Sequence, residues 1–263
     1  PAVERHPWNT AFTWVDRTGP FRRITQRQAD QFNRDGFIVL DDMFSDEELA
    51  PVLAATDELE GRTDEFLGHM EGGRLSIAEQ GAITFSLFLV QSSPAARSFA
   101  AHPVFADLCH DLIGPDVRLY HDQAVYKKAE KPRRFPWHQD NGYTFVAPQQ
   151  YLTCWVALTD ATVDNGCPHV VPGLHRLGTL QHHYVDPLGW EIFEDHPDAV
   201  AAPVGKGGIV KDDERIKAVI DDIREFGEGL GIKALKIIEV PREKERKNKE
   251  YFIVWEKLNG PTG

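Results

Sequence analysis

The chain has little cysteine and no long hydrophobic run. Its three cysteines, Cys109, Cys154 and Cys167, are odd in number and show no C-x-x-C spacing, which favours buried thiols in a reducing compartment over a zinc knuckle or a disulfide framework. No apolar run approaches the roughly 18 residues of a membrane span, and residues 1–6 lack the start of a secretion signal. We therefore expect a cytoplasmic protein that makes no membrane contact.

Basic residues are also few. The sequence holds 29 Lys and Arg against 41 Asp and Glu, and the formal net charge is -12. Nucleic-acid binding requires clustered Lys and Arg that neutralise phosphates, so this balance argues against a nucleic-acid surface. The length of 263 residues is enough for one large domain whose core needs no disulfides.

The composition changes near Val210. Residues 211–263 contain neither His nor Cys and hold 12 Lys and Arg against 12 Asp and Glu, so residues 1–210 carry the whole net charge. Apolar residues at a 3.6-residue period from Ile216 to Phe226 predict a helix. Two predicted strands follow it, Lys233 to Val240 and Glu250 to Lys257, joined by a charged loop. We expect a main domain over 1–210, and over 211–263 a helix–strand–strand segment that either completes this domain or is a separate appendage.

Helix signals are concentrated at the start of the main domain. Thr25 with Gln28, and Ser45 with Glu48, have the spacing of capping boxes, and Gly36 is placed to end the first helix. Pro51 lies deep enough in the second helix to disturb it or to move its start.

Short strands are expected after these helices. The buried run 37–40 and the segments 117–127, 151–158 and 169–171 have the residue types of strands, with an Asn165-Gly166 turn before the last. This order of elements favours a mainly β sandwich or barrel with flanking helices.

His138, Gln139 and Asp140 form an H-x-D triplet. On a strand, residues two apart point to the same face, so the imidazole and the carboxylate would enter one cavity. Such a pair is two thirds of the 2-His-1-carboxylate triad that binds non-haem Fe(II) with positions left open. On spacing alone, the simpler interpretation is a hydrogen-bonded polar pair at the end of a strand.

The first 210 residues resemble the phytanoyl-CoA dioxygenase (PhyH) family of Fe(II)/2-oxoglutarate oxygenases. The matching pieces, in chain order, are Arg34 to Leu40, Asp122 to Lys127, Trp137 to Asp140, Thr153 to Leu158, Asp164 to Cys167 and Pro172 to Arg176. The resemblance implies a double-stranded β-helix, the cupin-like jelly roll, with Fe(II) between its two sheets. By position it also implies that His138 and Asp140 are the first two iron ligands.

The same resemblance points to residues around the co-substrate. A lysine after the strand near Val125, either Lys127 or Lys128, matches a 2-oxoglutarate contact, although both would by default be solvated lysines at the surface. Thr153 and Trp155 match the pocket lining, and Trp155 would by default be a core residue. Gln123 is a weaker match to a cofactor contact.

The third iron ligand has no counterpart in the sequence. The family's distal His and the Arg after it would follow Val210, but the last histidine of the chain is His196. Substitutes considered are His169, His175, the pair His182 and His183, which is expected to be an exposed loop pair, and Glu239 with Lys249 in place of the Arg.

The resemblance implies hydroxylation of a small molecule, with O2 consumed and 2-oxoglutarate converted to succinate and CO2. Retention of Asp140 favours hydroxylation, since halogenating relatives lose this carboxylate. Two alternatives stay open: a catalytically impaired or hybrid PhyH-like chain that acts as a binding protein, and a cupin-like metal hydrolase or isomerase. Residues 57–72 and 185–198 are candidate lid or substrate-wall segments. We expect a monomer or a homodimer.

Overall fold

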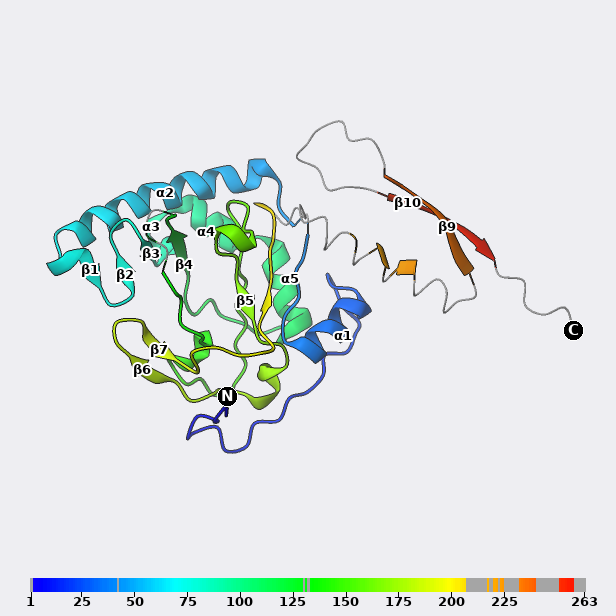
Figure 1. Ribbon diagram of the computed structural model, residues 1–263, viewed down its shortest axis with the longest axis horizontal. Coiled ribbons are helices and arrows are strands. Elements are labelled where there is room, and N and C mark those ends of the chain that lie inside the picture. Colours follow the sequence, from blue (N-terminus) through cyan, green and yellow to red (C-terminus); the bar gives the residue numbers. More distant parts are fainter. Residues whose placement is uncertain are drawn as a thin grey trace, which may run out of the picture.

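The computed structural model describes residues 2–41, 43–129, 131, 133–206, 217, 220–221, 223–224, 232–239 and 251–257. Helices in this part are α1 (Gln26–Asp35), α2 (Asp46–Gly68), α3 (Leu89–Ser92), α4 (Pro94–Ala100) and α5 (Pro103–Leu112), with 3-10 turns η1 (Glu71–Gly73), η2 (Asp140–Gly142), η3 (Val163–Asn165) and η4 (Leu174–Leu177). Strands are β1 (Arg74–Leu75), β2 (Ala78–Glu79), β3 (Ile83–Leu87), β4 (Gln123–Lys127), β5 (His169–Val170), β6 (His183–Val185), β7 (Gly189–Glu191), β8 (Val200–Ala201), β9 (Ile232–Glu239) and β10 (Tyr251–Lys257). Figure 1 shows α2 lying along one side of the body that contains β1 to β8.

Both predicted capping boxes are present. The Thr25 side chain accepts a hydrogen bond from the Gln28 amide, Ser45 does the same for Glu48, and each partner side chain accepts from the cap backbone. Gly36 ends α1 in the left-handed region at φ 83°, as expected for a glycine cap. The expected effect of Pro51 was wrong, because α2 begins at Asp46, directly after its cap, and continues through the proline.

The Ser45 cap yields a stability prediction. Ser45→Ala is expected to lower the free energy of unfolding by about 1 kcal/mol, because it leaves a helix amide without its side-chain acceptor. Urea unfolding measures the change, and Ser45→Asp, which keeps an acceptor at the cap, serves as the control. Equal stability of all three proteins would show that the cap contributes nothing.

The largest sheet is antiparallel in the order β1-β2-β3-β4. Strands β3 and β4 pair along their length, from Ile83 opposite Lys127 to Leu87 opposite Gln123. One face of this sheet packs against α2, where Tyr126 donates a hydrogen bond to Asp57 at 2.6 Å. Because side chains alternate along a strand, Gln123 and Lys127 belong to the other face.

Several predicted strands are wrong in the described part of the chain. Segments 37–40, 117–122 and 151–158 are not in any strand, and of the predicted ranges 117–127 and 169–171 the strands cover 123–127 and 169–170. Ile38, Leu40 and Leu152 pack instead against the buried cluster of α1 and α5. These apolar residues are therefore buried against helices. A short hydrophobic run in the sequence does not show whether it is buried against a helix or within a sheet.

The described part thus combines antiparallel sheets with helices, as expected in outline. Besides the four-stranded sheet there are two-stranded pairs β5 with β8, β6 with β7 and β9 with β10. The jelly roll stays a prediction. None of the helices in the described ranges is both apolar enough and long enough to cross a membrane.

The two strands predicted in the C-terminal segment are confirmed. β9 and β10 pair antiparallel, from Tyr251 opposite Glu239 to Lys257 opposite Ile232, with a shift of register between Val254 and Trp255. Residues 217, 220, 221, 223 and 224 are helical, within the predicted helix. The rest of that helix and the charged loop at 241–249 lie outside the described residues, and the division of the chain at 210 stays a prediction.

Candidate metal site

The side chains of His138 and Asp140 meet, although not on a strand. His138 lies outside any strand, Gln139 has an extended backbone, and Asp140 is the first residue of η2. Nε2 of His138 lies 3.2 Å from Oδ1 of Asp140, and the two side chains are 24% and 37% exposed. The local turn therefore brings the imidazole and the carboxylate together while leaving both accessible to a small ligand.

The other ring nitrogen of His138 is held by the backbone. Nδ1 lies 2.8 Å from the carbonyl oxygen of Pro136, and since a carbonyl only accepts, Nδ1 carries the proton. Burial works to lower the pKa of His138, but the hydrogen bonds with Asp140 and Pro136 outweigh it and leave the pKa raised. The hydrogen bond from His138 holds the pKa of Asp140 below its usual range.

This arrangement fits two ligands of a divalent metal ion. A ligating histidine commonly donates its second N–H to a carbonyl, as His138 does to Pro136. A cation that bound both Nε2 and the carboxylate of Asp140 would compete with protons for these atoms. An imidazole nitrogen and a carboxylate oxygen suit ferrous iron.

Thr153 and Trp155 come from a segment outside any strand, beside this pair. The Thr153 hydroxyl donates a hydrogen bond of 2.5 Å to Oδ2 of Asp140, which leaves Oδ1 as the oxygen that faces His138. Trp155 is 53% exposed, so the default expectation of a core residue was wrong. Cys154, between them, forms a hydrogen bond with Cys109 of α5.

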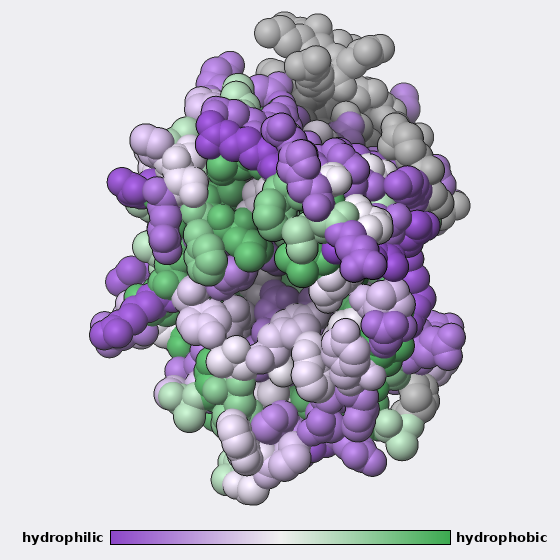
Figure 2. Space-filling model, turned by 90° about the vertical axis from the view of Figure 1, so that its left-hand side faces the viewer, coloured by the Kyte–Doolittle hydropathy of each residue, from purple (hydrophilic) through white to green (hydrophobic). Residues whose placement is uncertain are grey.

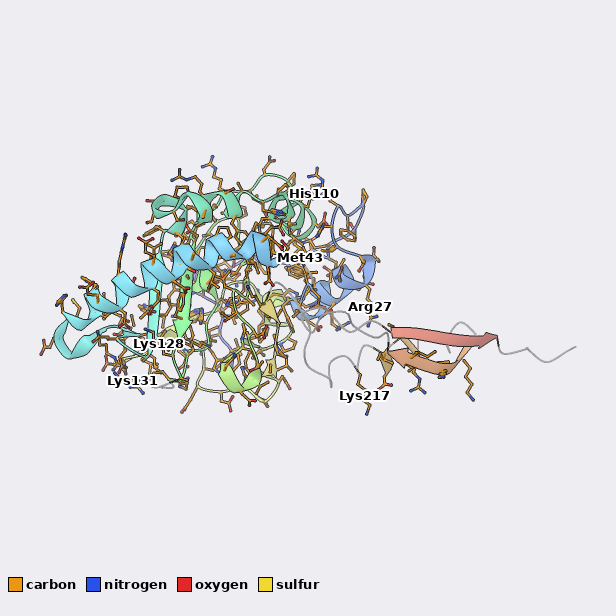
Figure 3. The ribbon with its side chains drawn as sticks, turned by 90° about the horizontal axis from the view of Figure 1, so that it is seen from above. Arg27, Met43, His110, Lys128, Lys131 and Lys217 are labelled. Carbon is orange, nitrogen blue, oxygen red and sulfur yellow. The ribbon has the colours of Figure 1, made fainter. Side chains whose placement is uncertain are left out.

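The two candidate lysines lie on opposite faces of the sheet. Lys128 forms ion pairs with Glu60 at 2.7 Å and Asp64 at 3.1 Å, and Figure 3 shows it beside α2. Lys127 donates to the carbonyl of Gly166 at 2.9 Å, and its ammonium lies 5.5 Å from the centre of the Phe135 ring.

Phe135 contacts both this lysine and one of the proposed metal ligands. Its ring centre lies 5.5 Å from that of His138, whereas Lys128 is paired with carboxylates of α2. Gln123 shares the face of Lys127, and its side-chain oxygen lies 3.4 Å from Nε2 of His121. The charge interaction with His121 contributes to lowering the pKa of Asp140. No motif in the sequence pointed to this histidine.

The described residues provide no third ligand, since no group of three His, Cys, Asp or Glu side chains among them is placed to hold a metal. His175 packs edge-on against Trp14 with ring centres 4.4 Å apart, and its Nε2 lies 3.1 Å from the carbonyl of Asn33. His169 lies on β5 with an exposed side chain. The side chain of Glu239 and all of Lys249 lie outside the described residues.

His182 differs from its expected exposed position. It is 3% exposed, its Nε2 accepts from the Gln139 amide at 3.0 Å, and its Nδ1 lies 3.0 Å from the carbonyl of Leu180. Both nitrogens are therefore already in use. His183 is exposed as predicted, but it lies on strand β6 and not in a loop.

The thiols of Cys109 and Cys154 form a contact that the spacing of the cysteines did not suggest. The hydrogen bond with Cys154 lowers the pKa of Cys109 to about 7 from its ordinary value of 9.0. Cys109 is half-buried and Cys154 exposed, whereas Cys167 is buried.

This contact predicts pH-dependent alkylation. Because the thiolate is the reactive form, the rate of iodoacetamide labelling at Cys109 is expected to rise through pH 7. In Cys154→Ala the midpoint should move up, toward pH 9. Peptide mass spectrometry across the pH range separates Cys109 from the other thiols. An unchanged midpoint in the variant would contradict the role of Cys154.

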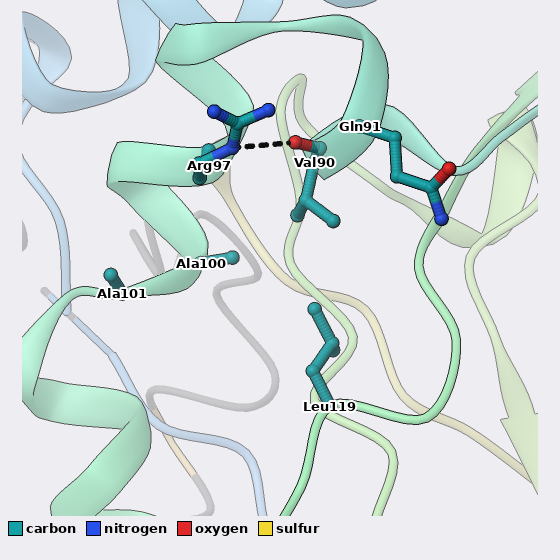
Figure 4. A pocket seen from close by; sticks show the side chains of 6 residues that line it. All are labelled: Val90, Gln91, Arg97, Ala100, Ala101 and Leu119. Atoms are coloured by element: carbon teal, nitrogen blue, oxygen red, sulfur yellow. Dashed lines mark hydrogen bonds between the residues drawn. The ribbon is translucent and has the colours of Figure 1, made fainter.

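A pocket of about 520 Å³ lies near α3 and α4, lined by Val90, Gln91, Arg97, Ala100, Ala101 and Leu119. Arg97 Nε donates to the carbonyl of Val90 at 2.9 Å across one side of it (Figure 4). The pocket contains none of the predicted site residues. Figure 2 shows that the face of the molecule carrying β1, β2, β6 and β7 is hollowed near its centre, with hydrophobic residues above the hollow.

Comparison with known proteins places these features in context. Residues 32–211 match the family described as phytanoyl-CoA dioxygenase (PhyH). The chain is 30% identical over 208 residues to an ectoine dioxygenase of Sphingopyxis alaskensis, which covers 71% of this chain and 67% of the relative. It is 32% identical over 159 residues to an ectoine dioxygenase of Bordetella bronchiseptica, covering 58% of this chain and 50% of that relative. The chain thus spans half to two thirds of these relatives.

Two solved structures are also similar. The 2-oxoglutarate-dependent epimerase SnoN from nogalamycin biosynthesis has a TM-score of 0.51 at 25% identity, with 69% of this chain and 70% of that chain covered. EctD of S. alaskensis, solved with 2-oxoglutarate and 5-hydroxyectoine, has a TM-score of 0.53 at 23% identity, with 78% and 72% covered. The second likeness shows a shared fold.

Proposed function

Because the chain belongs to the phytanoyl-CoA dioxygenase family, we propose that it is an Fe(II)- and 2-oxoglutarate-dependent oxygenase that hydroxylates a small molecule. The observation that carries this proposal is the 3.2 Å approach of His138 Nε2 to Asp140 Oδ1 within the H-x-D motif. The jelly roll belongs to the same proposal and is supported by the similar folds of SnoN and EctD.

Each proposed site residue has a separate role. His138 and Asp140 would hold the iron, and the hydrogen bond from Thr153 to Oδ2 of Asp140 would leave Oδ1 free to bind it. When bound, ferrous iron and 2-oxoglutarate supply O2 activation, coupled to the conversion of 2-oxoglutarate to succinate and CO2. Trp155, two residues after Thr153 and exposed, would form a wall of the pocket.

Lys127 is the proposed partner for a carboxylate of 2-oxoglutarate. Its ammonium lies over Phe135, whose ring neighbours His138, and the exposed Gln123 lies on the same face of β4. The ion pairs of Lys128 with Glu60 and Asp64 on α2 favour Lys127 over Lys128 in this role.

Substitution of the two lysines tests this assignment. Lys127→Ala is expected to raise the KM for 2-oxoglutarate about tenfold, as loss of a hydrogen bond to a charged group of roughly 1.5 kcal/mol would do. Lys128→Ala removes an equal charge from the opposite face and should leave that KM unchanged. Succinate formation at varied 2-oxoglutarate measures both. The reverse ranking of the two variants would assign the contact to Lys128.

The substrate itself is proposed only by class. The names of the relatives include both ectoine dioxygenase and phytanoyl-CoA dioxygenase, and these imply very different molecules. A small organic substrate is what these names have in common.

A second candidate function follows from the missing third ligand. No described residue completes a triad with His138 and Asp140, and the sequence has no histidine after His196. A family member that binds a small molecule without turning over 2-oxoglutarate would fit this observation.

Anaerobic titration with Fe(II) and 2-oxoglutarate decides between the two functions. An oxygenase should develop the weak visible charge-transfer band of the chelate, and admission of O2 should then yield succinate. Metal-replete protein that shows neither the band nor succinate would rule out the oxygenase and leave the binding protein.

A further inference from the structure

Three hydrogen bonds connect the H-x-D turn with residues 178–182. The Gln139 side chain donates to the carbonyl of Gly178 at 3.1 Å and accepts from the amide of Leu180 at 2.8 Å. The Gln139 amide donates to Nε2 of His182 at 3.0 Å. The residue between the two proposed ligands therefore makes three hydrogen bonds to one segment.

The ring of His182 has a single arrangement that satisfies these bonds. Because Nε2 accepts from an amide, the ring proton must be on Nδ1, where it is donated to the carbonyl of Leu180 at 3.0 Å. His182 is 3% exposed, so water does not replace either partner. The ring also lies against Gly142, where a Cβ would come within 1.9 Å of its Cε1.

Residues 4–9 of the N-terminal segment form hydrogen bonds with residues 179–181. The His6 amide donates to the carbonyl of Thr179 at 3.0 Å, and the Gln181 amide donates to the carbonyl of Glu4 at 2.9 Å. The buried side chain of Asn9 donates to the carbonyl of Thr179 at 2.9 Å. These N-terminal residues precede the range 32–211 that matches the family.

We propose that His182 is a positioning residue for the metal site, and that residues 4–9 keep it in place. His138 and Asp140 flank Gln139, so a shift of the Gln139 amide moves both side chains and changes their separation. His182 prevents this shift by accepting the amide hydrogen from a buried ring that is itself anchored. The inference rests on the proposed function, because it takes His138 and Asp140 to be metal ligands.

Three substitutions at position 182 distinguish the effect of the hydrogen-bond acceptor from the effect of the side-chain volume. His182→Leu keeps an apolar volume but removes the acceptor. His182→Gln can place its side-chain oxygen near the position of Nε2, whereas His182→Asn is polar but ends near the position of Nδ1 and does not reach Gln139. His169→Ala, an exposed histidine on β5, is the control.

Two readouts that do not depend on turnover are used. Mn(II) affinity is measured from the EPR signal of the free ion, and exchange of the Gln139 amide is followed by NMR. The leucine and asparagine variants are expected to bind Mn(II) about 10- to 100-fold more weakly, the range found when an outer partner of a metal site is lost, and to exchange the Gln139 amide faster. The glutamine and control variants should stay close to the wild type. Asn9→Ala should weaken Mn(II) binding in the same direction.

Failure of the proposed function and failure of this inference give different results. Wild-type protein that does not bind Mn(II) would remove the proposed function and this inference with it. Wild-type binding that all variants match, or a glutamine variant as weak as the leucine variant, would overturn the inference and leave the proposed function standing. If the leucine variant does not fold, the comparison of glutamine with asparagine decides.

Discussion

His138→Ala is expected to abolish 2-oxoglutarate-dependent oxygen consumption. The variant loses Nε2, one of the two proposed metal-binding atoms, which the turn brings to within 3.2 Å of each other. Loss of an outer partner alone costs about 10- to 100-fold in metal affinity, so loss of the ligand itself should cost at least about 100-fold. Oxygen uptake with added Fe(II), together with Mn(II) binding by EPR, measures both effects.

Two further variants make this result specific. His183→Ala removes an exposed imidazole on β6 and should retain full activity. Asp140→Asn keeps the size of the side chain and an oxygen for Thr153 but loses the charge, and it should resemble His138→Ala. Iron-dependent turnover by a folded His138→Ala protein would show that the metal is bound elsewhere and would end the proposed role of this pair.

Gly142→Ala is expected to damage both stability and the metal site. The added Cβ would lie 1.9 Å from Cε1 of His182 and 2.4 Å from each ring nitrogen. The backbone at Gly142 is not left-handed, so the penalty is steric. The His182 ring is buried and hydrogen-bonded at both nitrogens, and overpacking of this kind costs about 1 to 3 kcal/mol. Displacement of the ring would also release the Gln139 amide.

A matched glycine provides the control for this substitution. Gly61 lies in α2, where an added Cβ meets nothing within 4 Å, and alanine there should be neutral or stabilising by up to about 1 kcal/mol. Urea unfolding and Mn(II) EPR measure the two glycine variants in parallel. A Gly142→Ala protein as stable as wild type, with unchanged Mn(II) affinity, would mean that the turn can move without cost to the site.

At the H-x-D turn, the sequence predicted which side chains meet but not the backbone that brings them together. The pairing of His138 with Asp140 depends on residues two apart, and the two side chains do meet, although at the start of a 3-10 turn and not on a strand. Thr153 was expected in the same pocket and does contact Asp140. The sequence offered no reason to prefer Lys127 or Lys128. The structure separates them, because Lys128 lies on the face of the sheet that meets α2 and Lys127 lies on the other face.

His182 shows where that reasoning failed. Its neighbour His183 is also a histidine and no periodic pattern surrounds them, so an exposed loop pair was the natural expectation. The burial of His182 comes from contacts with Gln139, more than 40 positions away in the chain, and from the N-terminal segment that covers residues 179–181. A histidine in use at both nitrogens cannot be recognised without those partners.

Local signals were sufficient for the caps of α1 and α2 and for the two C-terminal strands, because each depends on residues a few positions apart or on a simple hairpin. The motif order was likewise sufficient for the family. The tertiary structure decided that segments 37–40 and 151–158 pack without joining a strand, which lysine meets α2 and which meets Phe135, and that His182 is buried against Gln139. These outcomes depend on contacts between distant parts of the chain, whose free energies are not encoded in any short window of sequence.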